Sequence, residues 1–200
     1  YHNDLANVLK EQGKFLESII FYKKAIEINP NNVEAYLNYA AALKSLNELD
    51  KALQLLKKVI SLNPSKITKL VAFNNLGNIY WKKRDSLNAF ENYKNALNID
   101  SKYILTLYNI GLLYEDLGDY SSALNLHRRI INLDKNFSYS LGKIVALERY
   151  ICDWRNFDKI LNYDKKALIN LFKINPRDSF FLFDDPKLDL QIARRYCNDN

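Results

Sequence analysis

The sequence predicts an all-α, right-handed superhelical solenoid that is built from stacked helix pairs. Similar segments recur 34 residues apart, as the spacing of Pro30 and Pro64 shows, and small residues recur at fixed places in each repeat. The 200 residues include only 5 Gly and 4 Pro, which are too few turn-forming residues for a fold of many short strands and hairpins. Long helices with brief connections follow from both observations.

The repeat is visible in two pairs of matching segments. Residues 25–30 match residues 59–64, and residues 96–101 match residues 130–135, each pair at a spacing of 34. Between the two pairs the spacing is 37, and we place the three extra residues at Ile67, Thr68 and Lys69. The first repeat is then expected to begin upstream of Tyr1 and to end at Asn32, and the others span 33–66, 70–103 and 104–137.

Small and bulky residues alternate inside the repeat. Small residues let two helices approach closely, and bulky ones fill the complementary space between them. The eighth position holds Ala6, Ala40, Gly77 and Gly111, the twentieth holds Ser18, Ala52, Ala89 and Ala123, and the twenty-fourth holds Tyr22, Leu56, Tyr93 and His127. Because His2 and His127 fall in such packing positions, we expect both to line the core. A period of 34 with this pattern resembles the tetratricopeptide repeat.

In that family the first helix of each pair lines a concave groove for extended peptide, with positions two, five, six, nine, twelve and thirteen facing inward. The sixth position carries Asn38, Asn75 and Asn109, and an amide can both donate to and accept from a peptide backbone. A ladder of amides is one interpretation, and chance is the other, since Asn is abundant. The lining would also include Asn7, Asn74, Asn78 and Trp81. A clamp for C-terminal carboxylates is not predicted, because the fifth positions lack its Lys.

Charge and composition exclude several other classes of function. The net charge is +6, but the basic residues are spread along the chain, whereas a nucleic-acid binder concentrates them on one stripe. Cys152 and Cys197 lack metal-ligand spacing, which predicts free thiols in a reducing compartment and no metal or cofactor site. No apolar run is long enough for a membrane span, so a cytoplasmic protein is expected. A homo-oligomer is left open, and the start at Tyr1 suggests a processed or excised chain.

The C-terminal third departs from the repeat. We expect repeats over 1–137, a capping helix pair over 138–173, and a linker with a last helix over 174–200. The capping pair starts with a helix from Ser138 to about Ile151, Cys152 is expected to be a small buried residue, and Asp153 caps the next helix. The apolar run at 180–183 predicts a docking surface for a missing part.

The same third resembles the O-linked N-acetylglucosaminyltransferase family, in particular its bacterial members. The resemblance rests on Cys-Asp-Trp after the repeats and on Asp-Asp-Pro further along, namely Cys152, Asp153, Trp154, Asp184, Asp185 and Pro186. It implies that the repeats present acceptor proteins to a nucleotide-sugar glycosyltransferase domain, and that residues 174–200 are the linker and the start of this missing catalytic domain. It also implies that the Asn ladder contacts the acceptor. Asp4 replaces Asn at the sixth position of the first repeat, which departs from the family pattern.

Two functions therefore follow from the sequence. The first is the substrate-recruiting region of a protein glycosyltransferase, with protein or peptide acceptors and the missing catalytic domain as partners. The second is a free-standing scaffold that belongs to no enzyme. In both cases this chain is expected to bind extended polypeptide and to carry no catalytic residues, because it shows no phosphate-binding loop and no general-base constellation.

Overall fold

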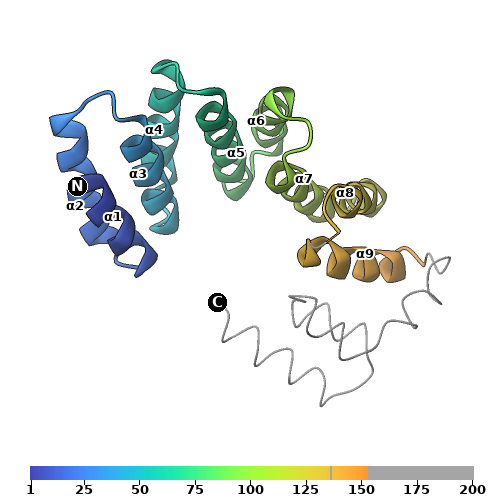
Figure 1. The fold of residues 1–200 in the computed structure, drawn as a ribbon. Coiled ribbons are helices and arrows are strands. Elements are labelled where there is room, and N and C mark those ends of the chain that lie inside the picture. The colour runs from blue at the N-terminus through green and yellow to red at the C-terminus, as the bar shows by residue number, and fades with distance from the viewer. Residues whose placement is uncertain (136, 153–200) are drawn as a thin grey trace, which may run out of the picture. The chain divides into compact units, whose positions relative to one another are not determined.

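The computed structural model describes residues 1–135 and 137–152. Within these residues the regular secondary structure consists of helices, which are joined by turns. The chain divides into two compact units, residues 1–106 and the residues from Leu107 onward. The helices are coloured along the chain in Figure 1. The predicted all-α architecture of paired helices is confirmed for the described part of the chain.

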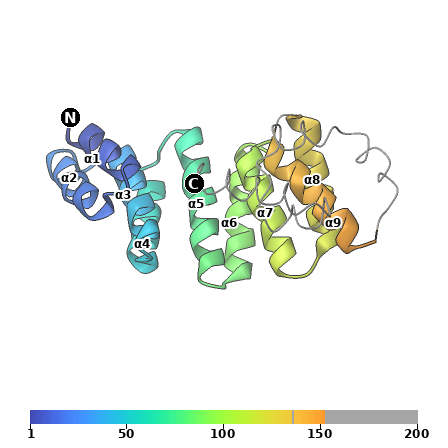
Figure 2. The same cartoon turned by 90° about the horizontal axis from the view of Figure 1, so that it is seen from below.

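The first unit contains three helix pairs, each made of a first and a second helix that pack against one another (Figures 1 and 2). The second helix of one pair also contacts the first helix of the next, and the first helices α1, α3 and α5 contact one another in order. The pairs are α1 (His2–Glu11) with α2 (Phe15–Ile28), α3 (Val33–Ser45) with α4 (Leu49–Ser61), and α5 (Lys66–Lys82) with α6 (Ser86–Ile99).

The second unit contains the remaining described helices. Helix α7 (Ile104–Asp116) begins at the end of the first unit and continues into the second, where α8 (Tyr120–Leu133) and α9 (Ser138–Tyr150) follow. Helix α8 packs against α9. The predicted helix from Ser138 to about Ile151 is confirmed, whereas the rest of the expected capping pair and the linker lie outside the described residues.

The turn inside each helix pair repeats one backbone conformation. Residues at the fifteenth repeat position have positive φ, with values of 76° at Gly13, 62° at Asn47, 64° at Arg84 and 79° at Gly118. The next N–H then donates back to the carbonyl of the eleventh position, as from Glu48 to Leu43 and from Asp119 to Tyr114. This bond caps the first helix and reverses the chain. Only Gly adopts that conformation without steric cost, so the Asn and Arg turns are the strained ones.

Side-chain caps fix where several of the helices begin. The amide of Asn32 accepts from Ala35 N–H at 3.1 Å before α3, and the hydroxyl of Ser65 accepts from Thr68 N–H at 3.2 Å before α5. Asp85 and Asp119 do the same for α6 and α8, and the hydrogen bonds that they accept lower the pKa of both carboxyls. These side-chain caps define the first residue of each of these helices, a role that Pro often has in other sequences and that the few Pro residues of this chain cannot fill.

The three residues that exceed the 34-residue period lie inside a helix. Ile67, Thr68 and Lys69 form the first turn of α5 after the cap at Ser65, and α5 is accordingly 17 residues long, against 13 for α3. An insertion of three residues adds about one helical turn, which keeps the inner register of the repeat nearly unchanged. The repeat therefore absorbs the insertion without a loop.

Cys152 contradicts the prediction that it is buried, because its side chain is exposed and its thiol is free. It follows the last turn of α9 with φ of 57°, a left-handed conformation that carries the residue away from the helix face. Asp153, Trp154, Asp184, Asp185 and Pro186 lie outside the described residues. The repeat boundary at 137 stays a prediction.

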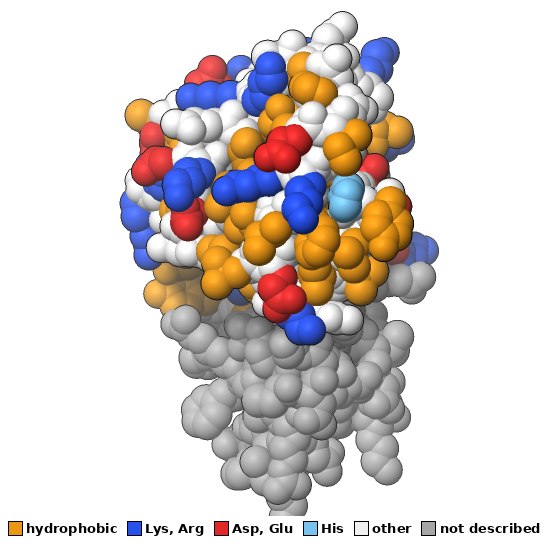
Figure 3. Space-filling model, turned by 90° about the vertical axis from the view of Figure 1, so that its left-hand side faces the viewer, with side chains coloured by type: hydrophobic (Ala, Val, Ile, Leu, Met, Phe, Trp, Pro, Cys, Tyr) orange, Lys and Arg blue, Asp and Glu red, His pale blue; other side chains and the backbone are white. Residues whose placement is uncertain are grey.

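The helix pair α1–α2 carries an apolar side. Hydrophobic side chains gather on the side of the molecule that Figure 3 displays. Tyr1, Leu16 and Ile20 are exposed large hydrophobic residues of this pair. His2 is half-buried and stacks on Phe21, so its predicted role as a core-lining residue is only partly met.

Candidate functional site: the first-helix face of the repeats

In the first unit, the row α1, α3 and α5 presents the residues that the sequence assigns to a groove. Asn38 and Asn75 occupy the same repeat position on α3 and α5, which pack side by side, and both are half-buried. Asn75 makes no hydrogen bond to another described residue, so both its donor and its acceptor are available. We call the side of this row that carries Lys10, Asn38, Lys44, Asn75 and Lys82 the first-helix face.

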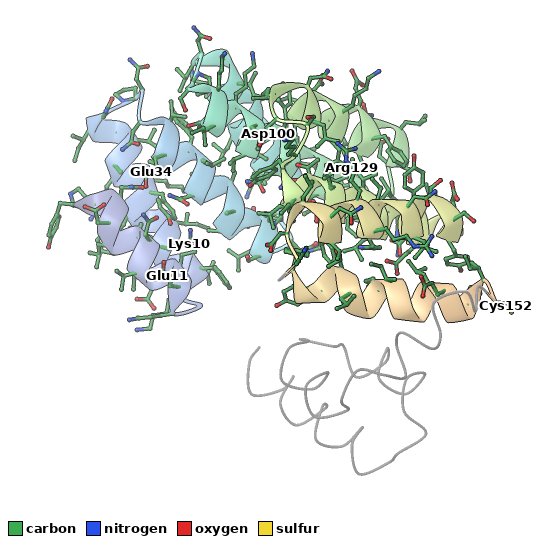
Figure 4. All side chains as sticks on the ribbon, turned by 45° about the vertical axis from the view of Figure 1, so that its right-hand side comes forward. Lys10, Glu11, Glu34, Asp100, Arg129 and Cys152 are labelled. Carbon is green, nitrogen blue, oxygen red and sulfur yellow. The ribbon has the colours of Figure 1, made fainter. Side chains whose placement is uncertain are left out.

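Lysines cross between neighbouring first helices on this face. Lys10 Nζ donates to Asn38 Oδ1 at 3.0 Å, from α1 to α3, and Lys10 is labelled near the end of α1 in Figure 4. Lys82 Nζ lies 3.5 Å from the backbone oxygen of Lys44, which joins α5 to α3. These lysines are absent from the groove residues predicted above, although Lys10 and Lys44 occupy the twelfth position and Lys82 the thirteenth, both of which face inward.

Asn7 and Asn78 act chiefly as internal hydrogen-bond acceptors. Tyr22 Oη donates to Asn7 Oδ1 at 2.8 Å, and Tyr93 Oη donates to Asn78 Oδ1 at 2.6 Å, with the same separation of fifteen residues along the chain. Both tyrosines are fully buried. A buried hydroxyl needs a partner, so each amide has a structural role at its oxygen and offers a ligand only its N–H₂ group.

Asn74 is unsuited to the lining role that the sequence suggests. It is 6% exposed, and its Oδ1 accepts from the hydroxyl of Thr106, itself fully buried, at 2.8 Å. An amide that is buried and bonded in this way cannot reach a ligand in a groove. Trp81, by contrast, is half-buried close to the end of α5, and its role as an anchor for a ligand stays a prediction.

Asn109 belongs to the second unit, and its alignment with Asn38 and Asn75 stays a prediction. It is half-buried on α7. The continuation of the sixth position, Lys143, is used inside the second unit, because its Nζ lies 3.0 Å from Glu115 Oε2. At the sixth position α9 thus carries a paired cation, whereas α3, α5 and α7 carry amides.

Glu115 and Lys143 belong to a buried polar network around His127. His127 is fully buried, which confirms the core role predicted for it, and its Nδ1 lies 3.0 Å from Ser140 Oγ. Its Nε2 lies 3.2 Å from Glu115 Oε1. Burial acts to raise the pKa of Glu115, but the hydrogen bond from His127 and the charge of Lys143 outweigh it and lower that pKa. The network joins α7, α8 and α9.

The buried tyrosine–asparagine pairs predict a loss of stability at alkaline pH. Burial, together with the negative charges of Glu34 and Glu11, raises the pKa of Tyr22 from 10.0 to about 12. The unfolded chain therefore releases this proton first, so the free energy of unfolding falls as the pH rises from 10 towards 12. Urea unfolding over this range should show a smaller decline in Tyr22→Phe, and an unchanged decline would contradict the assignment.

The described residues contain no group of three or more His, Cys, Asp or Glu side chains that could hold a metal ion. Among the helices described, none combines the length and the apolar composition that a membrane span requires.

Family models identify the repeats. Models described as tetratricopeptide repeat match residues 1–32, 21–54 and 68–136. The last of these ranges covers the predicted third and fourth repeats almost completely. The gap at 55–67 falls where α4 ends and the additional residues of α5 begin.

Curated relatives share the repeats over about half of the chain. Hsp70-Hsp90 organizing protein 3 of Arabidopsis thaliana is 38% identical over 93 residues, which is 46% of this chain and 16% of the relative. The probable UDP-N-acetylglucosamine–peptide N-acetylglucosaminyltransferase SPINDLY of the same plant is 29% identical over 112 residues, or 56% of this chain and 12% of the relative. The chain thus spans a small part of the length of these relatives.

Solved structures share the fold. The pilF protein of Pseudomonas aeruginosa has a TM-score of 0.75 at 16% identity, with coverage of 97% of this chain and 88% of that one. YrrB, described as a TPR protein with an unusual peptide-binding site, has a TM-score of 0.58 at 16% identity, with coverage of 96% and 90%. The chain therefore belongs to the tetratricopeptide-repeat proteins, with residues 1–54 and 68–136 matched by the family models.

Proposed function

We propose that the chain binds extended polypeptide on its first-helix face and recruits protein substrates for a nucleotide-sugar-dependent protein glycosyltransferase. The observation that carries the binding role is the pair Asn38 and Asn75, which stand at one repeat position on adjacent helices. A peptide in extended conformation offers an N–H and a C=O at regular intervals; the amide of Asn75 can pair with both, and that of Asn38, whose Oδ1 accepts from Lys10, can donate to the C=O. Binding of this kind reads the backbone and accepts many sequences.

The link to a glycosyltransferase has two supports. One is the similarity to SPINDLY, a probable peptide N-acetylglucosaminyltransferase. The other is the sequence resemblance at Cys152, Asp153 and Trp154 and at 184–186, of which only Cys152 lies in the described residues. Its exposed thiol is free, and the resemblance there rests on the sequence alone.

A scaffold without an enzymatic parent is the second candidate. It is favoured by Hsp70-Hsp90 organizing protein 3, which is named for organizing other proteins and is 38% identical over its matched region, against 29% for SPINDLY. The coding sequence beyond Asn200 distinguishes the two candidates. A reading frame that continues into a long series of alternating strands and helices supports the glycosyltransferase, and a stop codon there supports the scaffold.

Removal of the amide row tests the binding role. Each of the variants Asn38→Ala, Asn75→Ala and Asn109→Ala should weaken binding of an unstructured Ser/Gly peptide by about fivefold, which corresponds to roughly 1 kcal/mol for a lost neutral hydrogen bond. Fluorescence anisotropy of a labelled peptide measures the affinity. Asn98→Ala and Asn125→Ala are matched controls, because both side chains are exposed on second helices. Equal affinity in the triple variant and the controls would exclude the amide row.

A further inference from the structure

The end of the first-helix face at α3 and α5 brings two lysines together. Lys82 Nζ lies 3.5 Å from the main-chain oxygen of Lys44, near the ends of both helices. Lys44 is half-buried, and Lys82 is exposed. A carbonyl oxygen is a weak partner for an ammonium group, because it carries no net charge. The Lys82 ammonium group thus lies beside the backbone of Lys44, where its positive charge also acts on the Lys44 ammonium group.

Neither of these lysines has a carboxylate partner among the described residues, in contrast to the three lysines that form ion pairs there. Lys51 pairs with Glu48, Lys83 pairs with Asp50 and Lys143 pairs with Glu115. Burial lowers the pKa of Lys44, and the positive charge of Lys82 lowers it further. An anion that bound between the two ammonium groups would compensate for both effects. It would replace the water that Lys44 loses on burial, and its negative charge would offset the repulsion between the lysines.

Hydrogen-bonding groups for a peptide lie on the same two helices. Asn38 is on α3 with Lys44, and Asn75 is on α5 with Lys82. Lys10 contacts Asn38 from the other side at 3.0 Å, so a third cation flanks the amide. The lysine pair therefore lies beside the row of amides, about 10 Å nearer the C-terminal ends of α3 and α5, where a side chain of a peptide that follows the amides can reach it.

We propose that the first-helix face selects extended polypeptide segments with an acidic side chain, whose carboxylate binds between Lys44 and Lys82. This inference rests on the proposed peptide-binding function and names its preferred ligand. The amides hold the backbone and the lysine pair takes the Asp or Glu side chain, so the acidic residue fixes the register of the peptide.

The distribution of charge on this face favours a peptide over a nucleic acid. Glu11 on α1 and Glu34 on α3 place negative charge in this part of the row, and both help to raise the pKa of the Tyr22 hydroxyl. A phosphate backbone carries charge at every step and would meet these carboxylates, whereas a peptide can place one acidic residue at the lysine pair and neutral residues elsewhere. Figure 4 labels Lys10 and Glu11, of opposite charge, at neighbouring positions of α1.

The test compares two labelled peptides on the whole chain. Both consist of Ser and Gly with an amidated C-terminus, and one carries a central Glu where the other carries Gln. Because a charge-assisted hydrogen bond replaces a neutral one, the Glu peptide should bind about fivefold to tenfold more tightly in fluorescence anisotropy. The preference should shrink as salt is added. Lys82→Gln and Lys44→Gln should each reduce it, and Lys57→Gln, exposed on α4, should leave it unchanged.

Each outcome decides the proposal. Equal binding of the two peptides by the wild-type chain overturns the acidic preference and leaves the peptide-binding function standing, and failure of both peptides to bind overturns the two together. A preference that persists in Lys82→Gln, whose exposed side chain can be changed without disturbing the fold, removes the lysine pair from the site. Tighter binding of a labelled single-stranded oligonucleotide than of the Glu peptide overturns the choice of ligand.

Discussion

Replacement of Gly77 by Ala is expected to lower the free energy of unfolding by about 1–3 kcal/mol, the range for overpacking a core. A Cβ at this position would lie 2.5 Å from Cδ1 of Tyr93, well inside van der Waals contact. The ring of Tyr93 cannot move aside, because it is fully buried and its hydroxyl is held by Asn78. Urea unfolding followed by circular dichroism measures the change.

The chain itself supplies the compensating change. In the preceding repeat the same two positions hold Ala40 and Leu56, a larger residue on the first helix with a smaller one on the second. The double variant Gly77→Ala, Tyr93→Leu should therefore lose less stability than the sum of the two single variants. Strictly additive losses would show that the contact between Gly77 and Tyr93 does not limit the helix spacing.

Replacement of Glu115 by Ala is expected to cost about 2–3 kcal/mol of unfolding free energy. The carboxylate joins His127 at 3.2 Å and Lys143 at 3.0 Å, and its removal leaves a buried imidazole nitrogen and a largely buried ammonium group with one partner fewer. The cost should exceed that of an ordinary surface ion pair, which is worth at most about 1 kcal/mol.

A matched control separates the network from loss of charge. Glu91 is exposed on α6 and has no ion pair within the described residues, so Glu91→Ala removes the same charge without opening a network. Glu115→Gln should recover part of the loss, because the amide oxygen can still accept a hydrogen bond. If Glu115→Ala and Glu91→Ala unfold at the same urea concentration, the network contributes nothing measurable to stability.

The helix pairs could be predicted from the sequence because small and large residues recur with a period that only stacked helices satisfy. Gly77 and Tyr93 show this well, since each is explained by the other once the repeat is recognised. The first helix of the capping pair was predicted to begin where the fourth repeat ends, and α9 begins at that residue, Ser138.

The roles of individual polar residues could not be read in this way. Asn74 and Asn75 are neighbours with one chemistry, yet one is bonded to Thr106 in the interior and the other is free to contact a ligand. A helix turns by about 100° per residue, so burial changes from one position to the next and depends on the adjacent helices. Lys44 and Lys82 were missed for a related reason, because their contact depends on how the ends of α3 and α5 pack, which the repeat pattern does not specify.

The pair at repeat positions eight and twenty-four has a consequence for folding. Arrays of similar repeats can misfold when one repeat takes the place of its neighbour. Here the pair differs in every repeat: Ala6 with Tyr22, Ala40 with Leu56, Gly77 with Tyr93, and Gly111 with His127. If the second helix of one repeat packed on the first helix of its neighbour in place of its own, as α6 on α3, the hydroxyl of Tyr93 would be buried without Asn78. These positions therefore distinguish otherwise interchangeable helices and disfavour exchanged pairings in the chain.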